Sequence, residues 1–376
     1  ILMNRLKFIL ILLIVDLIIS NLIFKNSKYW EYPKWNEKWW RVSSLNYHHT
    51  ILPNIDKKER WGERIEKRII TNSLGFIDTK IRKIEKKNTE KKRILLIGDS
   101  FIEGSGVDYK ETFFGLLSSY LGKKYEILNS AVGSYSPSIY YKKTKFYIEK
   151  GYEFNQALVF LDVSDIYDEL FVKFDSNGNI LTERQVKNYS LFKKNFYSLG
   201  RFLRDNTITF RFLNILSDRT ELFKNYIKLK IKASNDLNKS FFNTDKDDVM
   251  FYRMTHIDRG FWTFNEEKYK NVEDGIKQSE KYLLKLFNLL KENNIDSTLI
   301  IYPWPTQILY GDKYHENYWK NFSNKNKIKF LSVFDEFQDT NKRDFIFENF
   351  IYGDIHWNKK GTKIVFNEVI KNINFD

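Results

Sequence analysis

Residues 92–106 read KRILLIGDSFIEGSG, and this stretch decides the fold. The branched residues 94–97 form an apolar run that stops at Gly98, and such a run between turn signals predicts a strand buried on both faces of a parallel sheet. Gly98 permits a sharp turn, so Ser100 is expected at the carboxyl end of the strand, where open α/β sheets bind ligands. A hydroxyl there is well placed to be a nucleophile. The alternative role for Ser100 is a helix N-cap or turn serine.

A second stretch near the end of the chain, residues 352–361, reads YGDIHWNKKG. Serine is a weak nucleophile until a base takes its proton, and an acceptor must hold that base in one tautomer. His356 can be the base and Asp354 the acceptor. The alternative is a dyad of Ser100 and His356, with Asp354 serving only as a cap for the last helix.

The two stretches together resemble the SGNH/GDSL hydrolase superfamily, whose first block is G-D-S and whose last block carries an aspartate and a histidine before the C-terminal helix. The D-x-H-W-N-x-x-G form beginning at Asp354 also looks like a segment of alginate O-acetylation proteins. The resemblance spans residues 93–370 and implies a three-layer α/β/α domain with a flavodoxin-like parallel sheet of about five strands. This chain departs from the family's usual D-x-x-H spacing, since Asp354 precedes His356 by two positions.

The resemblance also assigns the oxyanion hole. The block after the strand expected at 125–129 would donate a backbone N–H, from Gly133 or from Ser134. The family's G-x-N-D block reads DVSD at 162–165, so Ser164 stands where an asparagine side chain would donate. Ser164 and the aspartate after it could instead cap a helix. Substrate contacts are expected from Asp99, Asp165, Trp304 and Trp357.

Elsewhere the sequence alternates apolar runs with helical stripes, as an α/β domain requires. The expected further strands are 157–161, 297–302 and 329–334, and the expected helices are 111–121, 137–151, 274–293 and 361–373.

Residues 8–24 are apolar except at Asp16, Ser20 and Asn21, and basic residues precede them. We expect an uncleaved membrane anchor here, although a signal peptide is the rival interpretation. Asp16 is costly in such a helix unless it finds a partner. The basic start of the run predicts a single-pass protein of the inner (cytoplasmic) membrane, with its catalytic domain outside the cytoplasm.

The expected organisation has four parts. Residues 1–25 form the anchor, and 26–91 form an aromatic-rich juxtamembrane and linker region. Residues 92–165 and 261–376 form the catalytic domain. Residues 166–260 are too long for an ordinary connection and are expected to form an inserted lid or subdomain, whose aromatics either build a sugar-binding wall or form its own core.

The composition and net charge exclude several classes of partner and of catalytic chemistry. The formal net charge is +14, but no nucleic-acid-binding motif is present, so attraction to an anionic envelope or acidic glycan is the simpler explanation and no nucleic-acid partner is expected. The absence of cysteine excludes disulfides and thiol catalysis. His48 and His49 should point in opposite directions in an extended segment, which argues against a shared metal ion. We expect no metal and no cofactor.

The expected function is a serine esterase or acyltransferase. Its substrate would be an O-acetyl or other small acyl ester of an envelope polysaccharide, and its possible partners are polysaccharide-assembly proteins. The alternative is a non-catalytic carbohydrate-binding or assembly protein that keeps the fold.

Overall fold

The computed structural model describes residues 2–24, 40–61, 65–88, 90–181, 199–200, 202–264 and 272–375. The chain divides into two compact units, one comprising Ile1–Trp39 and Lys187–Asp245 and the other Trp40–Val186 and Lys246–Asp376. The predicted insertion therefore lies partly in the first unit, while its two ends belong to the second. Of the predicted aromatic-rich region, residues 26–39 lie outside the described residues.

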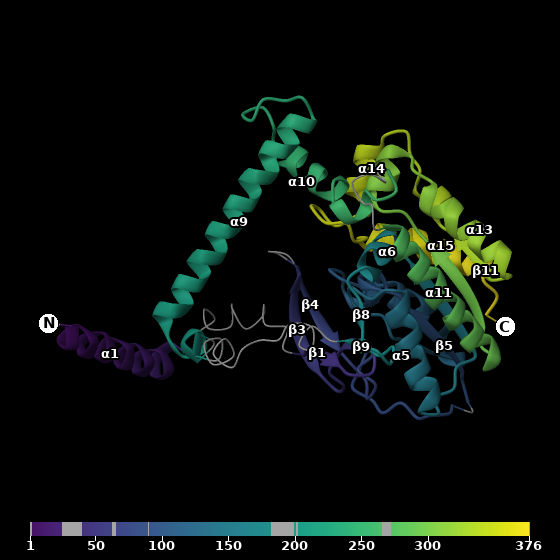
Figure 1. The fold of residues 1–376 in the computed structure, drawn as a ribbon, viewed down its shortest axis with the longest axis horizontal. Coiled ribbons are helices and arrows are strands. Elements are labelled where there is room, and N and C mark those ends of the chain that lie inside the picture. Colours follow the sequence, from purple (N-terminus) through teal and green to yellow (C-terminus); the bar gives the residue numbers. More distant parts are fainter. Residues whose placement is uncertain are drawn as a thin grey trace. The chain divides into compact units, whose positions relative to one another are not determined.

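The second unit contains a parallel sheet of five strands in the order β11-β10-β7-β5-β6. Figure 1 labels β5 and the edge strand β11 of this sheet. The strands are β5 Lys92–Ile97, β6 Tyr125–Asn129, β7 Gln156–Leu161, β10 Asp296–Ile301 and β11 Lys329–Ser332. The predicted parallel sheet is confirmed. Its strand order reverses between β5 and β7, and in doubly wound sheets the ligand crevice lies at the carboxyl ends of the strands at this point.

Burial explains why these strands could be predicted from the sequence. Every residue of β7 is buried, as is every residue of β5 after the first. Strands covered on both faces need apolar side chains on both, which gives a continuous run instead of an alternation.

Helices cover both faces of the sheet. Helix α4 (Phe113–Leu121) packs against α15 (Lys359–Asn372), and α5 (Pro137–Glu149) packs against α11 (Val272–Glu292). The connection from β5 to β6 runs across the sheet in the opposite direction to those from β6 to β7 and from β7 to β10. Right-handed crossovers therefore place α4 on one face and α5 and α11 on the other, giving three layers. The remaining helices of this unit are α3 Ser100–Glu103, α6 Val163–Glu169, α10 Lys246–Thr255, α12 Pro305–Tyr310, α13 Tyr314–Asn326 and α14 Lys342–Asn349.

Two antiparallel hairpins precede the sheet and belong to the same unit. The first pairs β1 Arg41–Ser44 with β2 His48–Ile51, and the second pairs β3 Asp56–Trp61 with β4 Ile65–Ile70. A third short pair joins β8 Lys173–Phe174 to β9 Ile180–Leu181. The first two hairpins contribute side chains to the site described below.

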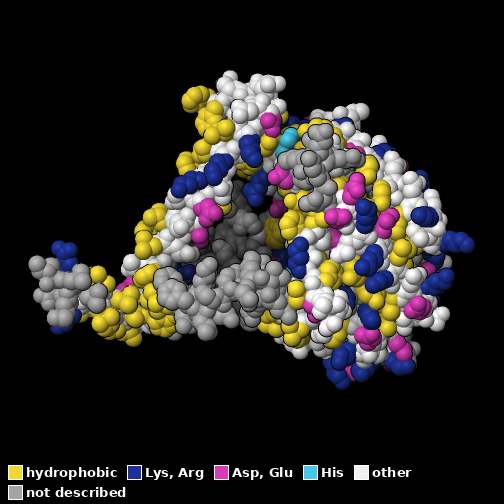
Figure 2. Space-filling model, viewed as in Figure 1, with side chains coloured by type: hydrophobic (Ala, Val, Ile, Leu, Met, Phe, Trp, Pro, Cys, Tyr) yellow, Lys and Arg dark blue, Asp and Glu magenta, His cyan; other side chains and the backbone are white. Residues whose placement is uncertain are grey.

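On the face shown in Figure 2, Lys and Arg side chains of the second unit lie among Asp and Glu side chains. On this face the positive excess is spread, with no single basic patch.

The first unit contains α1 (Leu2–Ile19), a π-helical turn (Ser20–Phe24) and α9 (Ile208–Asp236). Asp16 Oδ1 accepts a hydrogen bond from Ile208 N–H at 3.0 Å, and its Oδ2 accepts one from Thr209 N–H at 3.1 Å. The carboxylate inside the apolar run thus satisfies the free N–H groups at the start of α9. Within the described ranges, no helix has both the length and the apolar character needed to cross a membrane.

Candidate active site

Ser100 is held at the junction between β5 and α3. Gly98 is packed so closely that a Cβ there would stand 2.9 Å from Ile102 Cγ1, so the turn requires glycine. Asp99 caps α3 by accepting the Phe101 N–H at 3.0 Å. Ser100 is the first residue of this short helix and is partly exposed. Its hydroxyl is therefore fixed by the fold and open to a substrate.

The loop before α15 carries the other two predicted catalytic residues. Gly353 has φ of 75°, a left-handed conformation that folds the chain back between Ile351 and His356. Asp354 N–H donates to Ile351 O at 2.8 Å, and Ile351 N–H donates to His356 O at 2.8 Å. This fold-back returns the Asp354 carboxylate to the His356 ring in spite of the short D-x-H spacing.

The structure brings Ser100, His356 and Asp354 into one hydrogen-bonded relay. His356 Nε2 lies 2.8 Å from Ser100 Oγ, and His356 Nδ1 lies 2.5 Å from Asp354 Oδ1. Asp354 Oδ1 also accepts the His356 backbone N–H at 3.0 Å. The three groups are connected in the order that base-assisted attack by a serine requires.

Asp354 remains ionised in spite of its surroundings. Burial opposes its ionisation, but the neighbouring His356 and the hydrogen bonds it receives lower the pKa of Asp354 to about 2. One of those bonds comes from Trp61 Nε1, which donates to Asp354 Oδ2 at 3.0 Å. Trp61 also packs edge-on against the His356 ring, with centroids 5.1 Å apart.

The predicted oxyanion donor Gly133 lies beside the nucleophile, since a Cβ at Gly133 would stand 3.4 Å from Ser100 Cβ. Its N–H nevertheless donates to Glu103 Oε2 at 2.7 Å. The structure thus corrects the expectation for Gly133, because Glu103, at the end of α3, places a buried carboxylate on that N–H. Ser134, the other candidate, is exposed, and its N–H meets no acceptor in the described part of the chain.

Glu103 is held by two cations from the hairpins. Arg41 Nη1 donates to Glu103 Oε2 at 2.9 Å, and Lys67 Nζ lies 3.9 Å from Glu103 Oε1. Burial would raise the pKa of Glu103, but Arg41, Lys67 and the Gly133 N–H together hold it below its usual range. Arg41 and Lys67 also face Glu59, at 3.3 and 3.7 Å. The cluster therefore pairs two cations with two carboxylates.

Ser164 also differs from its predicted role. Its hydroxyl donates to Asp162 Oδ1 at 2.8 Å, within a capping box in which Asp162 and Asp165 cap α6. Of the predicted alternative, a helix cap formed by Ser164 and Asp165, only Asp165 takes part, because Asp162 is the N-cap of α6. Asp162 is the cause, because its carboxylate accepts the hydrogen bond that the Ser164 hydroxyl donates.

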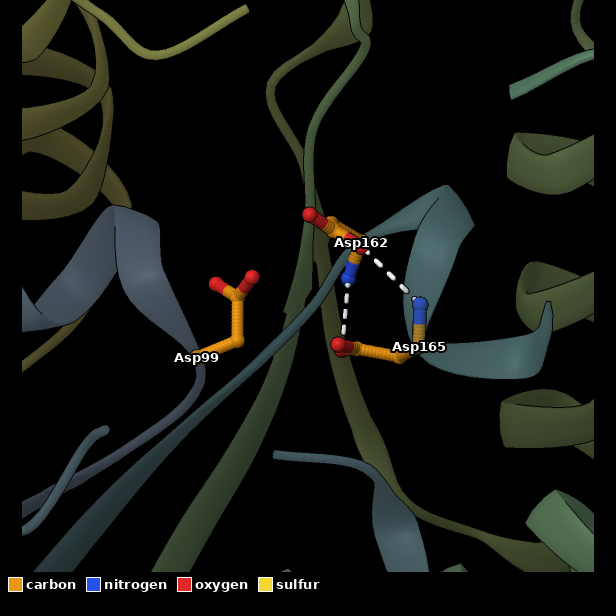
Figure 3. Close-up of side chains that lie close together, drawn as sticks. All are labelled: Asp99, Asp162 and Asp165. Atoms are coloured by element: carbon orange, nitrogen blue, oxygen red, sulfur yellow. Dashed lines mark hydrogen bonds between the residues drawn. The ribbon is translucent and has the colours of Figure 1, made fainter. Parts of the chain in front are cut away.

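Three buried carboxylates lie behind Ser100. Oxygens of Asp99, Asp162 and Asp165 come within 4.8 Å of one another (Figure 3). The spacing would admit a metal ion. However, Asp162 already accepts hydrogen bonds from Ser164 N–H, from the Ser164 hydroxyl, from Asp165 N–H and from Trp304 Nε1. Asp162 is thus satisfied as an ionised carboxylate by hydrogen-bond donors alone.

The four predicted substrate contacts are all buried. Asp165 and Trp304 are 0 % exposed, and Asp99 and Trp357 are 3 % exposed. Trp357 packs against Phe101, with ring centroids 4.8 Å apart. These four residues are buried, and their direct contact with a substrate stays a prediction.

The hairpins supply site residues that the sequence did not reveal: Arg41, Glu59, Trp61 and Lys67. His49 belongs to the same group, since its Nε2 lies 2.9 Å from Gly133 O. Burial lowers the pKa of His49 to about 4, so the ring is neutral. His48 and His49 do not diverge as expected. Their Nδ1 atoms lie 2.6 Å apart because His48 has a positive φ of 83°.

No protein-family model and no curated protein matches the chain. Among solved structures, TesA is 10% identical with a TM-score of 0.36, covering 74% of this chain and 97% of its own. A member of the lipolytic protein G-D-S-L family from Veillonella parvula is 11% identical with a TM-score of 0.36, covering 75% and 98%. The psychrotrophic esterase EstA from Pseudoalteromonas sp. is 10% identical with a TM-score of 0.33, covering 75% and 96%. At such low identity and TM-score, the similarity assigns neither activity nor substrate to this chain.

Proposed function

We propose that this protein is a serine-dependent ester hydrolase or acyltransferase. The observation that carries the proposal is the continuous relay from Ser100 Oγ through both ring nitrogens of His356 to Asp354. A serine hydroxyl, a base on its proton and a carboxylate on the base form the arrangement that acyl transfer uses on unrelated folds.

The chemistry proceeds in two halves. Ser100 Oγ attacks the ester carbonyl carbon while its proton passes to His356 Nε2, and that proton then leaves with the departing alcohol. Water or an acceptor hydroxyl attacks the acyl-enzyme, His356 takes its proton, and the proton returns to Oγ as the bond from carbon to Oγ breaks. Throughout, Asp354 keeps the proton on Nδ1 and stabilises the imidazolium.

The oxyanion is assigned to two backbone donors. Ser100 is the first residue of α3, so its N–H has no acceptor within the helix. Ser134 N–H is the second donor in this proposal.

The proposed substrate is an O-acetyl or other small acyl ester of an envelope polysaccharide. Its support is the D-x-H-W-N-x-x-G segment at Asp354, together with the apolar run at 8–24 that would hold the protein at the inner membrane. This part of the proposal is an analogy.

A non-catalytic carbohydrate-binding or assembly role is the second candidate. The observation that favours it is the occupation of two predicted oxyanion donors, Gly133 N–H by Glu103 and the Ser164 hydroxyl by Asp162.

The purified protein and Ser100→Ala separate the two roles. We expect the wild type to release acetate from an aryl acetate and from an O-acetylated polysaccharide, and the variant to release none above background. A folded wild type that binds the polysaccharide but hydrolyses neither ester would favour the assembly role.

A further inference from the structure

Ser100 Oγ has one proton and two hydrogen-bond partners. It lies 2.8 Å from His356 Nε2 and 2.9 Å from Asp99 Oδ2. A hydroxyl donates once, so only one of these neighbours can accept its proton, and the other must donate to the oxygen.

The relay decides which neighbour accepts. Asp354 is ionised and can only accept, so the proton of a neutral His356 ring lies on Nδ1. His356 Nε2 then carries a lone pair, and the hydroxyl that faces it must donate. Ser100 has no second proton for Asp99 Oδ2. With His356 neutral, the contact between Asp99 and Ser100 is therefore a hydrogen bond only if Asp99 donates it.

The other oxygen of Asp99 has the environment of a carbonyl. Oδ1 accepts the Phe101 N–H at 3.0 Å, and the Tyr302 hydroxyl approaches it at 3.4 Å. A proton on Oδ2 therefore leaves every polar atom of Asp99 with a suitable partner. If Asp99 were ionised while Ser100 donates to His356, Asp99 Oδ2 and Ser100 Oγ would face each other as two acceptors with no proton between them.

The charges around Asp99 also favour its neutral form. The Asp162 carboxylate accepts four hydrogen bonds, and Asp99 and Asp165 lie close to it in the interior (Figure 3). The pKa of Asp99 lies well above its ordinary value. Burial is the largest cause, and electrostatic repulsion from Asp162 is the second. Two ionised carboxylates at this distance repel, so one ionises and its neighbour holds a proton.

In the described part of the chain, Asp99, Asp162 and Asp165 form no ion pair, although Arg259 interacts with Asp162 and Asp99 at longer range. Arg259 is the cation that faces the carboxylates, and its guanidinium forms an ion pair with Asp168 at 2.7 Å. Among the described residues, His356 also approaches Asp99 through their shared contact with Ser100 Oγ. The hydroxyls of Tyr302 and Tyr140 face Asp99 as well, and burial raises the pKa of both.

We propose that Asp99 is a neutral carboxylic acid that donates a hydrogen bond to Ser100 Oγ and so acts as a further catalytic residue. This inference rests on the proposed acyl-transfer function. Asp99 keeps its proton throughout, while His356 moves the transferred one. Its donated bond stabilises the negative charge that develops on Oγ as the acyl-enzyme bond breaks, so Asp99 assists deacylation.

The variants Asp99→Asn and Asp99→Ala test the donor role. An asparagine amide still donates to Oγ and still accepts the helix N–H, so kcat should fall by only about threefold, whereas alanine should lower it by about thirty- to a hundredfold. The alanine variant should also show a burst of product before slow turnover, because deacylation is the impaired step. Equal loss in both variants, with both still folded, would overturn the proposal.

A second readout does not depend on turnover. At neutral pH the infrared difference between wild type and Asp99→Asn should contain the carbonyl stretch of a protonated carboxylic acid, and the exposed control Asp56→Asn should show only loss of a carboxylate band. A carboxylate band lost in Asp99→Asn would refute the neutral acid. If wild type neither reacts with a fluorophosphonate nor hydrolyses any ester, the proposed function fails, while the infrared result still decides the protonation of Asp99.

Discussion

The two sides of Ser100 use opposite electrostatic arrangements. Towards His356, each proton has one donor and one acceptor, and the chain of bonds ends on the ionised Asp354. Towards Gly133, buried carboxylates occupy the donors that an oxyanion would need, with Glu103 on the backbone N–H and Asp162 on the Ser164 hydroxyl. The hydrogen-bonded relay that activates Ser100 is therefore complete. On the Gly133 side, where the substrate oxygen would bind, buried carboxylates accept the hydrogen bonds of the expected oxyanion donors.

The largest effect should come from the complete side. Asp354→Asn keeps the shape but can present an N–H to His356 Nδ1, which favours the wrong tautomer, and a comparable change in a serine protease costs about 10⁴ in kcat. We expect kcat to fall at least about a hundredfold, with KM and melting temperature little changed. A variant that melts earlier but turns over normally would make Asp354 a mere cap.

On the Gly133 side, removing the charge of Glu103 should lower the free energy of unfolding. Glu103→Gln can still accept the Gly133 N–H but leaves Arg41 and Lys67 with one carboxylate partner, so the free energy of unfolding at pH 7 should fall by about 2 kcal/mol. Because folding depresses the pKa of Glu103, its contribution is present above its unfolded value of 4.5 and is lost as the pH falls below it. The difference from wild type should therefore shrink in acid.

Denaturant titrations from pH 3 to pH 8 measure this difference. The matched control is Glu273→Gln, an exposed partner of Lys277, which should change little. A difference that stays constant with pH would show that the charge of Glu103 is not the cause.

Trp61→Phe tests how the hairpins support the relay. It keeps the ring against His356 but removes the N–H donor to Asp354, so kcat/KM should fall about tenfold. Loss of this donor should raise the pKa of Asp354, because the Trp61 hydrogen bond helps to lower it, so activity in acid should be lost at a higher pH. Trp319→Phe is the control, since that buried indole N–H has no hydrogen-bond acceptor. Identical profiles for both variants would limit Trp61 to packing.

The smallest effect is expected at Ser164. Its hydroxyl donates to Asp162, whose carboxylate caps α6, so Ser164→Ala should lower the free energy of unfolding by about 1 kcal/mol and change kcat by less than about twofold. A hundredfold loss of kcat at unchanged stability would restore Ser164 to the oxyanion hole.

The elements that could be predicted from sequence are those whose signal is local. Strands such as β5 read as apolar runs because both faces are buried, and Gly353 with Asp354 and His356 forms one turn within six residues of chain. The hairpins gave no such signal, since β3 reads DKKERW and exposes charge along an edge. The pairing of Trp61 with Asp354 crosses 293 positions, and nothing in a single sequence links residues that far apart.

One missed residue did leave a local signal. Glu103 lies between Ile102 and Gly104, directly after the G-D-S block, and a glutamate in a segment that must be buried needs a cation. That requirement predicts a partner such as Arg41 without saying where it lies. The conflict between Glu103 and the oxyanion hole became visible only through the distance from its carboxylate to Gly133 N–H.

The central claim is that Ser100 is a nucleophile activated by His356 and Asp354. A fluorophosphonate probe followed by peptide mass spectrometry tests it directly, because the phosphonyl group bonds covalently only to an activated hydroxyl. We predict one adduct per chain, on Ser100, with none in Ser100→Ala and slow formation in Asp354→Asn. A folded wild type that forms no adduct, or an adduct on another residue that persists in Ser100→Ala, would contradict the account.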